Sequence, residues 1–339
     1  MKTKPEEDTF CALVVRKEDD GSCHHRVESR RLADLPEGDV LIRVRYSSLN
    51  YKDALSANGN RGVTRRYPHT PGIDAAGQVC SSTVSDFSPG MNVLCMGYDL
   101  GMNTPGGFGE YISVPASWVM ALPEGLSPLA AMQLGTAGFT AAQCVHALVA
   151  HDLQPDGGPV LVTGSTGGVG SLAVRLLAHL GYRVAAVTGK IDQEPYLRDL
   201  GASDVIGREQ LLRGTGRMLL RERWAGVVDT VGGDMLANAI KATQYGGVVT
   251  CCGNAASGEL PLNVYPFILR GILLAGIDSA NCSMQRRQEI WNKLAGEWRL
   301  PELDRLARIV SLAEVSGELD RMLRGQARGR VVVDLGEEQ

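Results

Sequence analysis

The stretch Val160–Gly181, which reads VLVTGSTGGVGSLAVRLLAHLG, predicts how the chain around it folds. It opens with an apolar run, Val160–Val162, of the kind that forms a strand buried on both faces. A glycine-rich turn follows, and beyond it apolar residues recur at helical spacing at Val169, Leu172, Ala173, Leu176, Leu177 and Leu180. A strand, a glycine turn and a helix in this order are typical of a dinucleotide-binding unit. In such units small residues let the backbone approach a pyrophosphate, and N–H groups at the helix start face its charge.

The glycine turn departs from the plain G-x-G-x-x-G pattern, because Ser165 and Thr166 occupy part of it. An alternative is a tight strand-to-helix turn that needs glycine only for its backbone angles. A second apolar segment, Arg183–Val187, comes one helix later, as a βαβ unit requires. This context favours a nucleotide site over a turn that is merely tight.

The end of that second strand predicts which nucleotide binds. An NAD enzyme usually has Asp or Glu there to hold the ribose hydroxyls, whereas this chain continues as Thr188, Gly189 and Lys190. A hydroxyl and a cation suit the extra phosphate of NADP, which a carboxylate would repel. The alternative is a solvated lysine in a turn, because Asp192 and Glu194 are close in sequence. We predict NADP as the cofactor.

Length and composition are those of a soluble protein with two domains. The chain has 339 residues, of which 44% are hydrophobic and 21% charged. A net charge of −4 argues against a nucleic-acid surface, and no apolar run approaches the roughly 20 residues that cross a bilayer. The polar residues 1–8 lack the apolar core of a signal peptide, so we expect a disordered lead-in and a cytoplasmic location.

The cysteines are scattered, and none forms a C-x-x-C pair. They are Cys11, Cys23, Cys80, Cys95, Cys144, Cys251, Cys252 and Cys282. We expect buried thiols in a reducing cytoplasm rather than disulfides or zinc ligands.

Two different patterns follow one another along the chain. From Cys11 to about Leu122 the signals are those of strands and turns with little helix, which predicts a small, curved β domain. Ser127 and Pro128 are suited to start a helix that leads into the nucleotide unit. Alternating strands and helices then continue to a strand at Ile272–Ile277. A helix is expected after residue 283 and a last strand from residue 330 to 335.

Seven short segments together carry a family resemblance. They are SSLNYKDAL (47–55), PGIDAAG (71–77), GTAGFTAA (135–142), TGSTGGVG (163–170), DTVGG (229–233), PFILR (266–270) and GIDS (276–279). In this order they resemble the zinc-independent branch of the medium-chain dehydrogenase/reductase superfamily. Within that branch they are similar to the YhdH/YhfP-type group of acryloyl-CoA reductases and quinone oxidoreductases. The match spans residues 35–335, and NYKD with PFILR is its most specific part.

The resemblance implies an α/β fold with two domains. A GroES-like, β-rich catalytic domain would comprise residues 1–132 and 280–339. A Rossmann NADP-binding domain with a doubly wound parallel sheet would comprise residues 133–279, with the cofactor at the crossover of the sheet. Such proteins usually form homodimers through the cofactor domain, so the strand Ile272–Ile277 is the candidate edge.

The resemblance also implies a set of cofactor-binding residues. They are Tyr51, Thr140, Ser165, Thr166, Gly167, Gly168, Val169, Thr188, Gly189, Lys190, Asn254, Ile268, Ser279 and Arg330.

We predict no metal. A zinc alcohol dehydrogenase of this superfamily needs a Cys, His and acid set with one open position. Here Pro71–Asp74 replaces the segment that would carry the His ligand, and His69 has no cysteine near it in sequence. Without zinc an alcohol is a poor substrate, because nothing stabilises the alkoxide.

Hydride addition to a carbon–carbon double bond conjugated to a carbonyl is more accessible, because hydrogen-bond donors can stabilise the enolate oxygen. The resemblance points the same way, to NADPH-dependent reduction of a 2-enoyl thioester, acryloyl-CoA to propanoyl-CoA. Two alternatives stay open: an NADPH:quinone oxidoreductase and a non-catalytic NADPH-binding protein.

Tyr51 is the candidate catalytic residue. Its hydroxyl is suited to donate a proton to the substrate α-carbon or to hold the carbonyl oxygen; the alternative is that it only packs on the cofactor. Lys52 and Asp53 are expected to be a structural pair rather than acid–base groups. Asn50 is a candidate substrate contact.

Arginines are candidates for the phosphates of CoA, because the guanidinium makes two hydrogen bonds at once. Arg65 and Arg66, with Arg61, follow NYKD, and Arg286 and Arg287 open the return to the catalytic domain. The alternative is that these side chains are solvated. Family members commonly have a His-Trp pair where this chain has Thr104-Pro105, which leaves the preferred acyl group open.

Overall fold

The computed structural model describes residues 9–336, so the expected N-terminal lead-in lies outside the described residues. The chain divides into two compact units. The first consists of Met1–Thr136, Ala280–Ala295 and Glu302–Gln339, and the second of Ala137–Ser279 and Gly296–Pro301. Helix α2 (Pro128–Ala150) contributes to both and is interrupted at Gly135, whose φ is 54°.

The second unit contains a six-stranded parallel sheet, as predicted for a doubly wound cofactor domain. Its strands are β8 (Val160–Val162), β9 (Val184–Thr188), β10 (Asp204–Gly207), β11 (Trp224–Asp229), β12 (Thr243–Cys251) and β13 (Leu273–Gly276). Their order is β10-β9-β8-β11-β12-β13, so the winding direction reverses between β8 and β11. Every residue of β8, β9 and β11 is buried, which explains the continuous apolar runs in the sequence.

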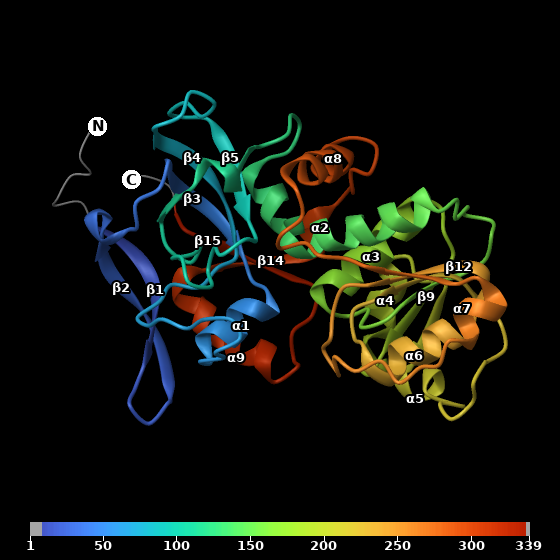
Figure 1. The fold of residues 1–339 in the computed structure, drawn as a ribbon. Helices are drawn as coiled ribbons and strands as arrows, with labels where there is room; N and C mark the ends of the chain where they lie inside the picture. The colour runs from blue at the N-terminus through green and yellow to red at the C-terminus, as the bar shows by residue number, and fades with distance from the viewer. Residues whose placement is uncertain (1–8, 337–339) are drawn as a thin grey trace. The chain divides into compact units, whose positions relative to one another are not determined.

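Helices connect these strands and are arranged around the sheet in Figure 1. They are α3 (Gly168–His179), α4 (Glu194–Asp199), α5 (Arg208–Leu211), α6 (Gly233–Lys241) and α7 (Tyr265–Arg270), with a 3-10 turn at Ile191–Gln193. The helix predicted after the glycine turn is α3, and it buries the apolar face that its spacing indicated.

The first unit is built mainly of antiparallel strands. A seven-stranded sheet has the order β14-β15-β3-β4-β5-β7, with β6 paired to β3, and β1 and β2 form a separate hairpin. The strands are β1 (Thr9–Lys17), β2 (Cys23–Arg31), β3 (Val40–Ser48), β4 (Asp74–Ser82), β5 (Asn92–Met96), β6 (Tyr111–Val114), β7 (Val119–Ala121), β14 (Ala307–Ser311) and β15 (Arg330–Asp334). The last predicted strand, β15, joins this sheet by pairing with β3.

The helices of the first unit are α1 (Tyr51–Ala57), α8 (Met284–Ala295) and α9 (Val315–Leu323), with 3-10 turns at Leu32–Asp34, Ala116–Trp118, Leu303–Arg305 and Leu312–Glu314. The prediction of little helix before residue 122 missed α1. Its start is fixed by Asp53, whose carboxylate accepts the N–H of Asn50 at 2.8 Å. The signal was therefore a polar residue before the helix and an acid three positions later.

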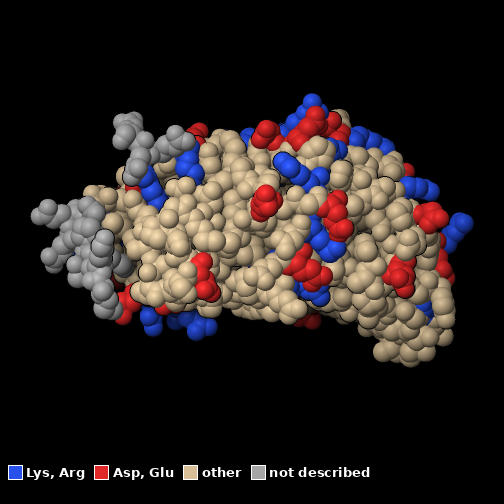
Figure 2. Space-filling view, turned by 90° about the horizontal axis from the view of Figure 1, so that it is seen from above, with Lys and Arg blue, Asp and Glu red and all other residues tan. Residues whose placement is uncertain are grey.

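The cysteines, the surface charges and the apolar character of the helices also bear on the sequence predictions. The eight cysteines form no disulfide within residues 9–336, but only Cys95 and Cys144 are buried. Cys11 and Cys80 are exposed and the other four are half-buried, so the expectation of buried thiols is wrong for most of them. Acidic and basic side chains are interspersed on the face drawn in Figure 2. None of the helices in residues 9–336 has the length and apolar character needed to span a bilayer.

Candidate active site

The glycine turn forms a cradle that has no room for a side chain at Gly164 or Gly170. Gly164 adopts a φ of 60°, and a Cβ on Gly170 would collide with the Gly164 carbonyl oxygen. The hydroxyl of Ser165 is turned inward and donates to the Val162 carbonyl oxygen at 2.7 Å. Helix α3 begins directly after the turn at Gly168, and the first N–H groups of a helix have no acceptor within it. The cradle therefore has the form that a pyrophosphate site requires, and its contact with a cofactor stays a prediction.

The end of β9 contains the residues predicted to select NADP. Thr188 is buried, and its Oγ1 accepts the backbone N–H of Lys190 at 2.9 Å. Partial burial lowers the pKa of Lys190, although Asp192 acts in the opposite direction. The structure adds Arg208, because a Cβ on Gly189 would collide with its guanidinium group. Two cations thus lie at the tip of β9.

Sequence reasoning missed Arg208 because it follows a different strand. Gly207, the last residue of β10, pairs with Thr188 at the end of β9. Because neighbouring parallel strands end at the same edge of a sheet, the residue after β10 comes to lie beside the residue after β9. A correct assignment of β10 would have revealed Arg208.

Asp229 is the last residue of β11, and it connects β11 to β8, the two strands between which the winding reverses. Its buried carboxylate accepts hydrogen bonds from Thr163 Oγ1 at 2.7 Å and from the Gly232 N–H at 2.8 Å. Burial raises the pKa of this carboxyl. Asp229 thus fixes the residue that precedes the glycine turn.

The remaining predicted cofactor residues of the second unit occupy different environments. Thr140 is buried on α2, Asn254 is exposed in the loop after β12, Ile268 is 70% exposed on α7, and Ser279 is half-buried after β13. Their contact with a cofactor stays a prediction.

In the first unit, Tyr51 is the first residue of α1, and its side chain is 53% exposed. The preceding residue, Asn50, is nearly buried. Its amide nitrogen donates to Asp74 Oδ2 at 2.8 Å and to the Ser48 carbonyl at 3.1 Å, and its amide oxygen faces Arg330 Nη1 at 3.4 Å. The structure therefore brings together two predicted site residues, Asn50 and Arg330.

Arg330 is buried, and its guanidinium group donates to protein acceptors. Besides Asn50 these are the Leu49 carbonyl at 3.0 Å, Ser48 Oγ at 2.8 Å and the Gln133 carbonyl at 3.3 Å. Burial lowers the pKa of Arg330 from its usual value, while Asp74 and Asp53 act in the opposite direction. The predicted contact of Arg330 with a cofactor stays a prediction.

Asp53 does not pair with Lys52 in the part of the chain that the structure describes, so that expectation is wrong. Its fully buried carboxylate accepts three backbone N–H groups, from Asn50 at 2.8 Å, Gly72 at 3.1 Å and Ile73 at 2.9 Å. Burial, and then the charge of Asp74, raise the pKa of Asp53 to about 7. Asp53 therefore joins the NYKD turn to the PGID turn.

The arginines proposed for CoA separate into two groups. Arg61, Arg65 and Arg66 are exposed. Arg287 is buried, donates to the Met96 carbonyl at 2.9 Å and the Ala280 carbonyl at 2.7 Å, and covers the Tyr98 ring. The expectation that Arg287 is available to CoA is wrong, because α8 uses this side chain to hold β5.

Arg286, the neighbour of Arg287, lies on the exposed side of α8. Its guanidinium pairs with Glu289 at 2.8 Å. A CoA role for it stays a prediction.

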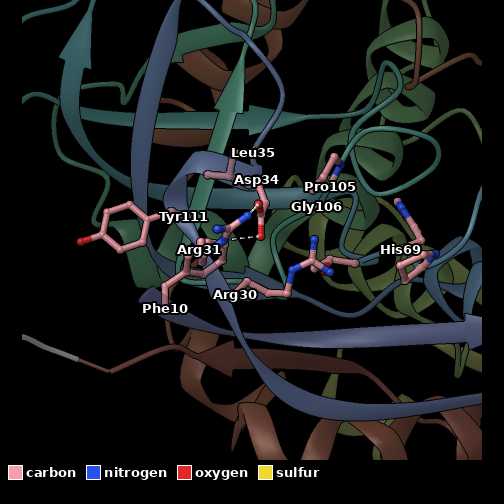
Figure 3. Close-up of a pocket in the computed structure, with 11 residues that line it drawn as sticks. Phe10, Arg30, Arg31, Asp34, Leu35, His69, Pro105, Gly106 and Tyr111 are labelled. Carbon is pink, nitrogen blue, oxygen red and sulfur yellow. Dashed lines mark hydrogen bonds and ion pairs between the residues drawn. The ribbon is translucent and has the colours of Figure 1, made fainter. Parts of the chain in front are cut away.

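A cavity of about 30 Å³ lies in the first unit beside His69 and Pro105. In the view of Figure 3, the ion pair of Arg31 and Asp34 (2.6 Å) lies across it from His69. Asn50 and Tyr51 are not among its lining residues. Burial lowers the pKa of His69, which favours its neutral form.

The donor sets within residues 9–336 do not fit a zinc site. No three His, Cys, Asp or Glu side chains there gather as a metal ion would require. The segment Pro71–Asp74, expected to replace the one that carries a His ligand in zinc enzymes, contains no His.

Comparisons with known proteins agree with this architecture. A model described as alcohol dehydrogenase GroES-like domain matches residues 36–124, and one described as zinc-binding dehydrogenase matches residues 168–296. These matches and the two sheets define a two-domain dehydrogenase of the medium-chain class.

Three relatives match nearly the whole chain. A protein named putative quinone oxidoreductase YhfP from Bacillus subtilis is 46% identical over 96% of this chain and 99% of its own. Acrylyl-CoA reductase AcuI from Ruegeria pomeroyi is 44% identical over 96% of this chain and 99% of its own. The crystal structure of the YhdH oxidoreductase from Salmonella enterica in complex with NADP has a TM-score of 0.93, 42% identity and coverage of 96% of this chain and 100% of that one.

A crystal structure of the Bacillus YhfP protein has NAD bound; it superposes with a TM-score of 0.94 at 44% identity and covers 97% of this chain and 100% of that one. At these identities the relationship extends through both units. The chain belongs to the YhdH/YhfP-type family of acryloyl-CoA reductases and quinone oxidoreductases, as the sequence predicted.

Proposed function

We propose that the protein uses NADPH to reduce an activated carbon–carbon double bond, with acryloyl-CoA as substrate and propanoyl-CoA as product. The observation that carries the proposal is the 44% identity to an acrylyl-CoA reductase over 96% of the chain. The carboxyl edge of the parallel sheet supports it, because a pyrophosphate cradle and two cations lie there.

The residues of the second unit fit NADPH. The turn at 164–170 would hold the pyrophosphate, and Lys190 and Arg208 would hold the 2′-phosphate, because no carboxylate ends β9. When bound, NADPH supplies a hydride. The second unit thus serves to bind and orient the cofactor.

Tyr51 is the residue of the first unit that we propose to act on the substrate. When hydride adds to the β-carbon of an enoyl thioester, negative charge develops on the thioester oxygen and the α-carbon must gain a proton. An exposed phenol at the start of α1 is suited to donate to either atom. The alternative, that Tyr51 only packs on the cofactor, predicts that loss of its hydroxyl has no effect on kcat.

Initial rates with a small substrate panel test the proposal. NADPH oxidation should be fastest with acryloyl-CoA, slower with longer 2-enoyl-CoA esters, and slow with ortho-quinones. Tyr51→Phe should lower kcat by about 10²- to 10⁴-fold if the hydroxyl transfers a proton. Turnover of quinones without turnover of any enoyl-CoA would contradict the proposal.

A second candidate function is NADPH:quinone reduction, which the name of the Bacillus relative favours. Its signature would be semiquinone formation with NADPH and ortho-quinones, detected by electron paramagnetic resonance. A non-catalytic NADPH-binding protein would show cofactor binding without turnover in either assay.

For the substrate's CoA group we propose Arg65 and Arg66, which are exposed close to NYKD in the chain. Replacing both by Ala should raise KM for acryloyl-CoA, more so at low salt, and leave a small quinone unaffected. An unchanged KM for acryloyl-CoA would place the CoA phosphates elsewhere.

We propose a division of labour close to the two compact units. Residues 1–132 and 280–339 would form the catalytic domain and residues 133–279 the NADP-binding domain. The second compact unit also includes Gly296–Pro301, which the sequence-based division had assigned to the catalytic domain.

We also propose a homodimer in the cytoplasm. Strand β13 is an edge of the parallel sheet, and Val264, Ile268 and Leu273 beside it are exposed apolar residues. Light scattering after size exclusion should give twice the mass of one chain, and Val264→Asp should reduce it to the mass of one chain. The lack of a disulfide among the eight cysteines within residues 9–336 supports a reducing compartment.

Activity should survive exhaustive chelation, because the donor sets described above do not fit zinc. Stoichiometric zinc that is lost together with activity would contradict a metal-free mechanism.

A further inference from the structure

In the first unit, Asn50 is one of four side chains that are joined in a closed ring of hydrogen bonds. Arg330 donates from Nη2 to Ser48 Oγ at 2.8 Å and from Nη1 to Asn50 Oδ1 at 3.4 Å. Ser48 Oγ and Asn50 Nδ2 in turn donate to the same oxygen, Oδ2 of Asp74, at 2.6 and 2.8 Å. All four side chains are buried.

Two members of the ring are charged, the Arg330 guanidinium and the Asp74 carboxylate. These charges decide which groups of the ring donate hydrogen bonds and which accept them. A guanidinium can only donate hydrogen bonds, and a carboxylate can only accept them. The amide of Asn50 must therefore point its oxygen at Arg330 and its nitrogen at Asp74. The reversed amide would place N–H groups against a cation and an oxygen against an anion, so a single orientation is stable.

Asp74 is held in turn by the kinked part of α2. Thr136 donates its N–H to Asp74 Oδ2 at 2.9 Å and its hydroxyl to Oδ1. The neighbouring Gly135 leaves no room behind the ring, because a Cβ there would collide with Ser48 Oγ, Arg330 Nη2 and Asp74 Oδ2. The ring is therefore held tightly against the kinked part of α2.

Asn50 connects the hydrogen-bonded ring to α1. Its N–H donates to Asp53 and its carbonyl accepts the Asp53 N–H at 3.0 Å, so it fixes the first turn of the helix. Tyr51 is the next residue, and its side chain is half exposed. The position of Tyr51 thus depends on its backbone, and its backbone depends on Asn50.

We propose that Asp74 and Arg330 are positioning residues that hold the amide of Asn50 and, through it, place Tyr51 for the reaction. This inference rests on the proposed function of Tyr51. It assigns Asn50 to the scaffold of the site rather than to the substrate.

Three variants separate the ring from general stability. Asn50→Ala breaks it. Asp74→Asn keeps the shape of the side chain but removes the anion, so the Asn50 amide loses the charge that fixes its orientation. Asn238→Ala is the matched control, because Asn238 is equally buried in the second unit and makes two hydrogen bonds, to Leu211 and Thr215.

The first measurement is the split between kcat and KM with acryloyl-CoA and saturating NADPH. Asn50→Ala should lower kcat by about 10- to 100-fold, the range for a misplaced catalytic group, with KM and the Kd for NADPH nearly unchanged. Asp74→Asn should lower kcat in the same way, and Asn238→Ala should leave it unaffected. A raised KM with unchanged kcat in Asn50→Ala would make Asn50 a substrate contact and overturn the proposal. An equal loss in Asn238→Ala would also overturn it.

The second measurement does not depend on turnover. In protein labelled with 3-fluorotyrosine, the ¹⁹F line of Tyr51 is identified by its loss in Tyr51→Phe. Asn50→Ala and Asp74→Asn should shift or broaden that line, whereas Asn238→Ala should not. An unchanged line in Asn50→Ala would overturn the positioning role even if the enzyme reduces acryloyl-CoA. A shifted line without any acryloyl-CoA turnover would support the ring and refute the proposed function instead.

Discussion

The two turns that carry the predicted site residues are built in opposite ways. In the second unit the turn at 164–170 depends on the absence of a side chain at Gly164 and Gly170, since a methyl group on Gly170 would meet backbone. In the first unit the turn before α1 depends on buried charged side chains, Asp53, Asp74 and Arg330. The first kind of turn presents backbone N–H groups to a ligand. The second kind holds one exposed phenol in place.

The difference also decides how each turn fails. A backbone cradle fails when volume is added, and the cost is local overpacking. A buried network fails when a partner is removed, because the remaining charge stays buried without compensation. Substitutions in the two units should therefore differ in the size of their effects and in the property, stability or cofactor affinity, that they change.

The largest effect is expected for Arg330→Ala. It removes the cation next to two buried carboxylates and should lower the free energy of unfolding by about 3–5 kcal/mol. Urea denaturation followed by circular dichroism measures this. Arg305→Ala is the control, because its ion pair with Glu302 is exposed and should be worth under about 1 kcal/mol. Equal losses in the two variants would mean that the buried network adds no stability of its own.

The next effect concerns the cations at the end of β9. Lys190→Ala and Arg208→Ala should each weaken NADPH binding by about 1.5–3 kcal/mol, the range for hydrogen bonds to charged groups. NADH binding should change little, because it lacks the 2′-phosphate. Titration of both cofactors by fluorescence measures the difference. A residue whose loss weakens NADPH and NADH equally does not contact the phosphate.

A smaller effect is expected for Gly170→Ala. Its Cβ would collide with the Gly164 carbonyl, and overpacking of this kind costs about 1–3 kcal/mol. Cofactor affinity should fall with it. Gly216→Ala is the control, because nothing lies within 4 Å of its added Cβ, and its effect should stay within about 0.5 kcal/mol. Unchanged NADPH affinity in Gly170→Ala would show that the cradle is not the pyrophosphate site.

The sequence predicted the second unit better than the first, and the reason is physical. The strand, glycine turn and helix at 160–181 are adjacent in the chain, so local pattern and backbone requirements are enough to identify them. Arg208 was missed because its place beside Gly189 depends on the pairing of β10 with β9, which no local pattern reveals.

In the first unit the ring joins Ser48, Asp74 and Arg330, which are far apart in the chain. Family resemblance flagged Asn50 and Arg330, but only the fold shows that they share a partner. Asp74 was not singled out at all, because a lone acid after Ile73 has no local signal of burial. Arg287 was misjudged for the same reason, since its burial depends on contacts with β5.

A different kind of effect is a pH dependence of stability, to which Asp53 in the first unit should contribute. The pKa of Asp53 is raised to about 7 by burial and by Asp74. Between about pH 4, the pKa of an unfolded Asp, and pH 7 the native state retains a proton that the unfolded state has lost. The contribution of Asp53 to stability therefore falls as pH rises through this window and is constant above it.

In Asp53→Asn that part of the pH dependence should disappear, although the variant is less stable because an amide N–H faces backbone N–H groups. Thermal unfolding at several pH values measures both effects. If the parent and Asp53→Asn lose stability in parallel between pH 4 and 7, another group is responsible.

The central claim is hydride transfer from NADPH to an enoyl thioester, and isotope tracing tests it most directly. With NADPH deuterated at C4, acryloyl-CoA and ordinary water, mass spectrometry should find propanoyl-CoA with one deuterium on C3 and a solvent proton on C2. The parent should form this product in step with NADPH oxidation, and Tyr51→Phe should slow both equally. NADPH oxidation without deuterated propanoyl-CoA would contradict the account.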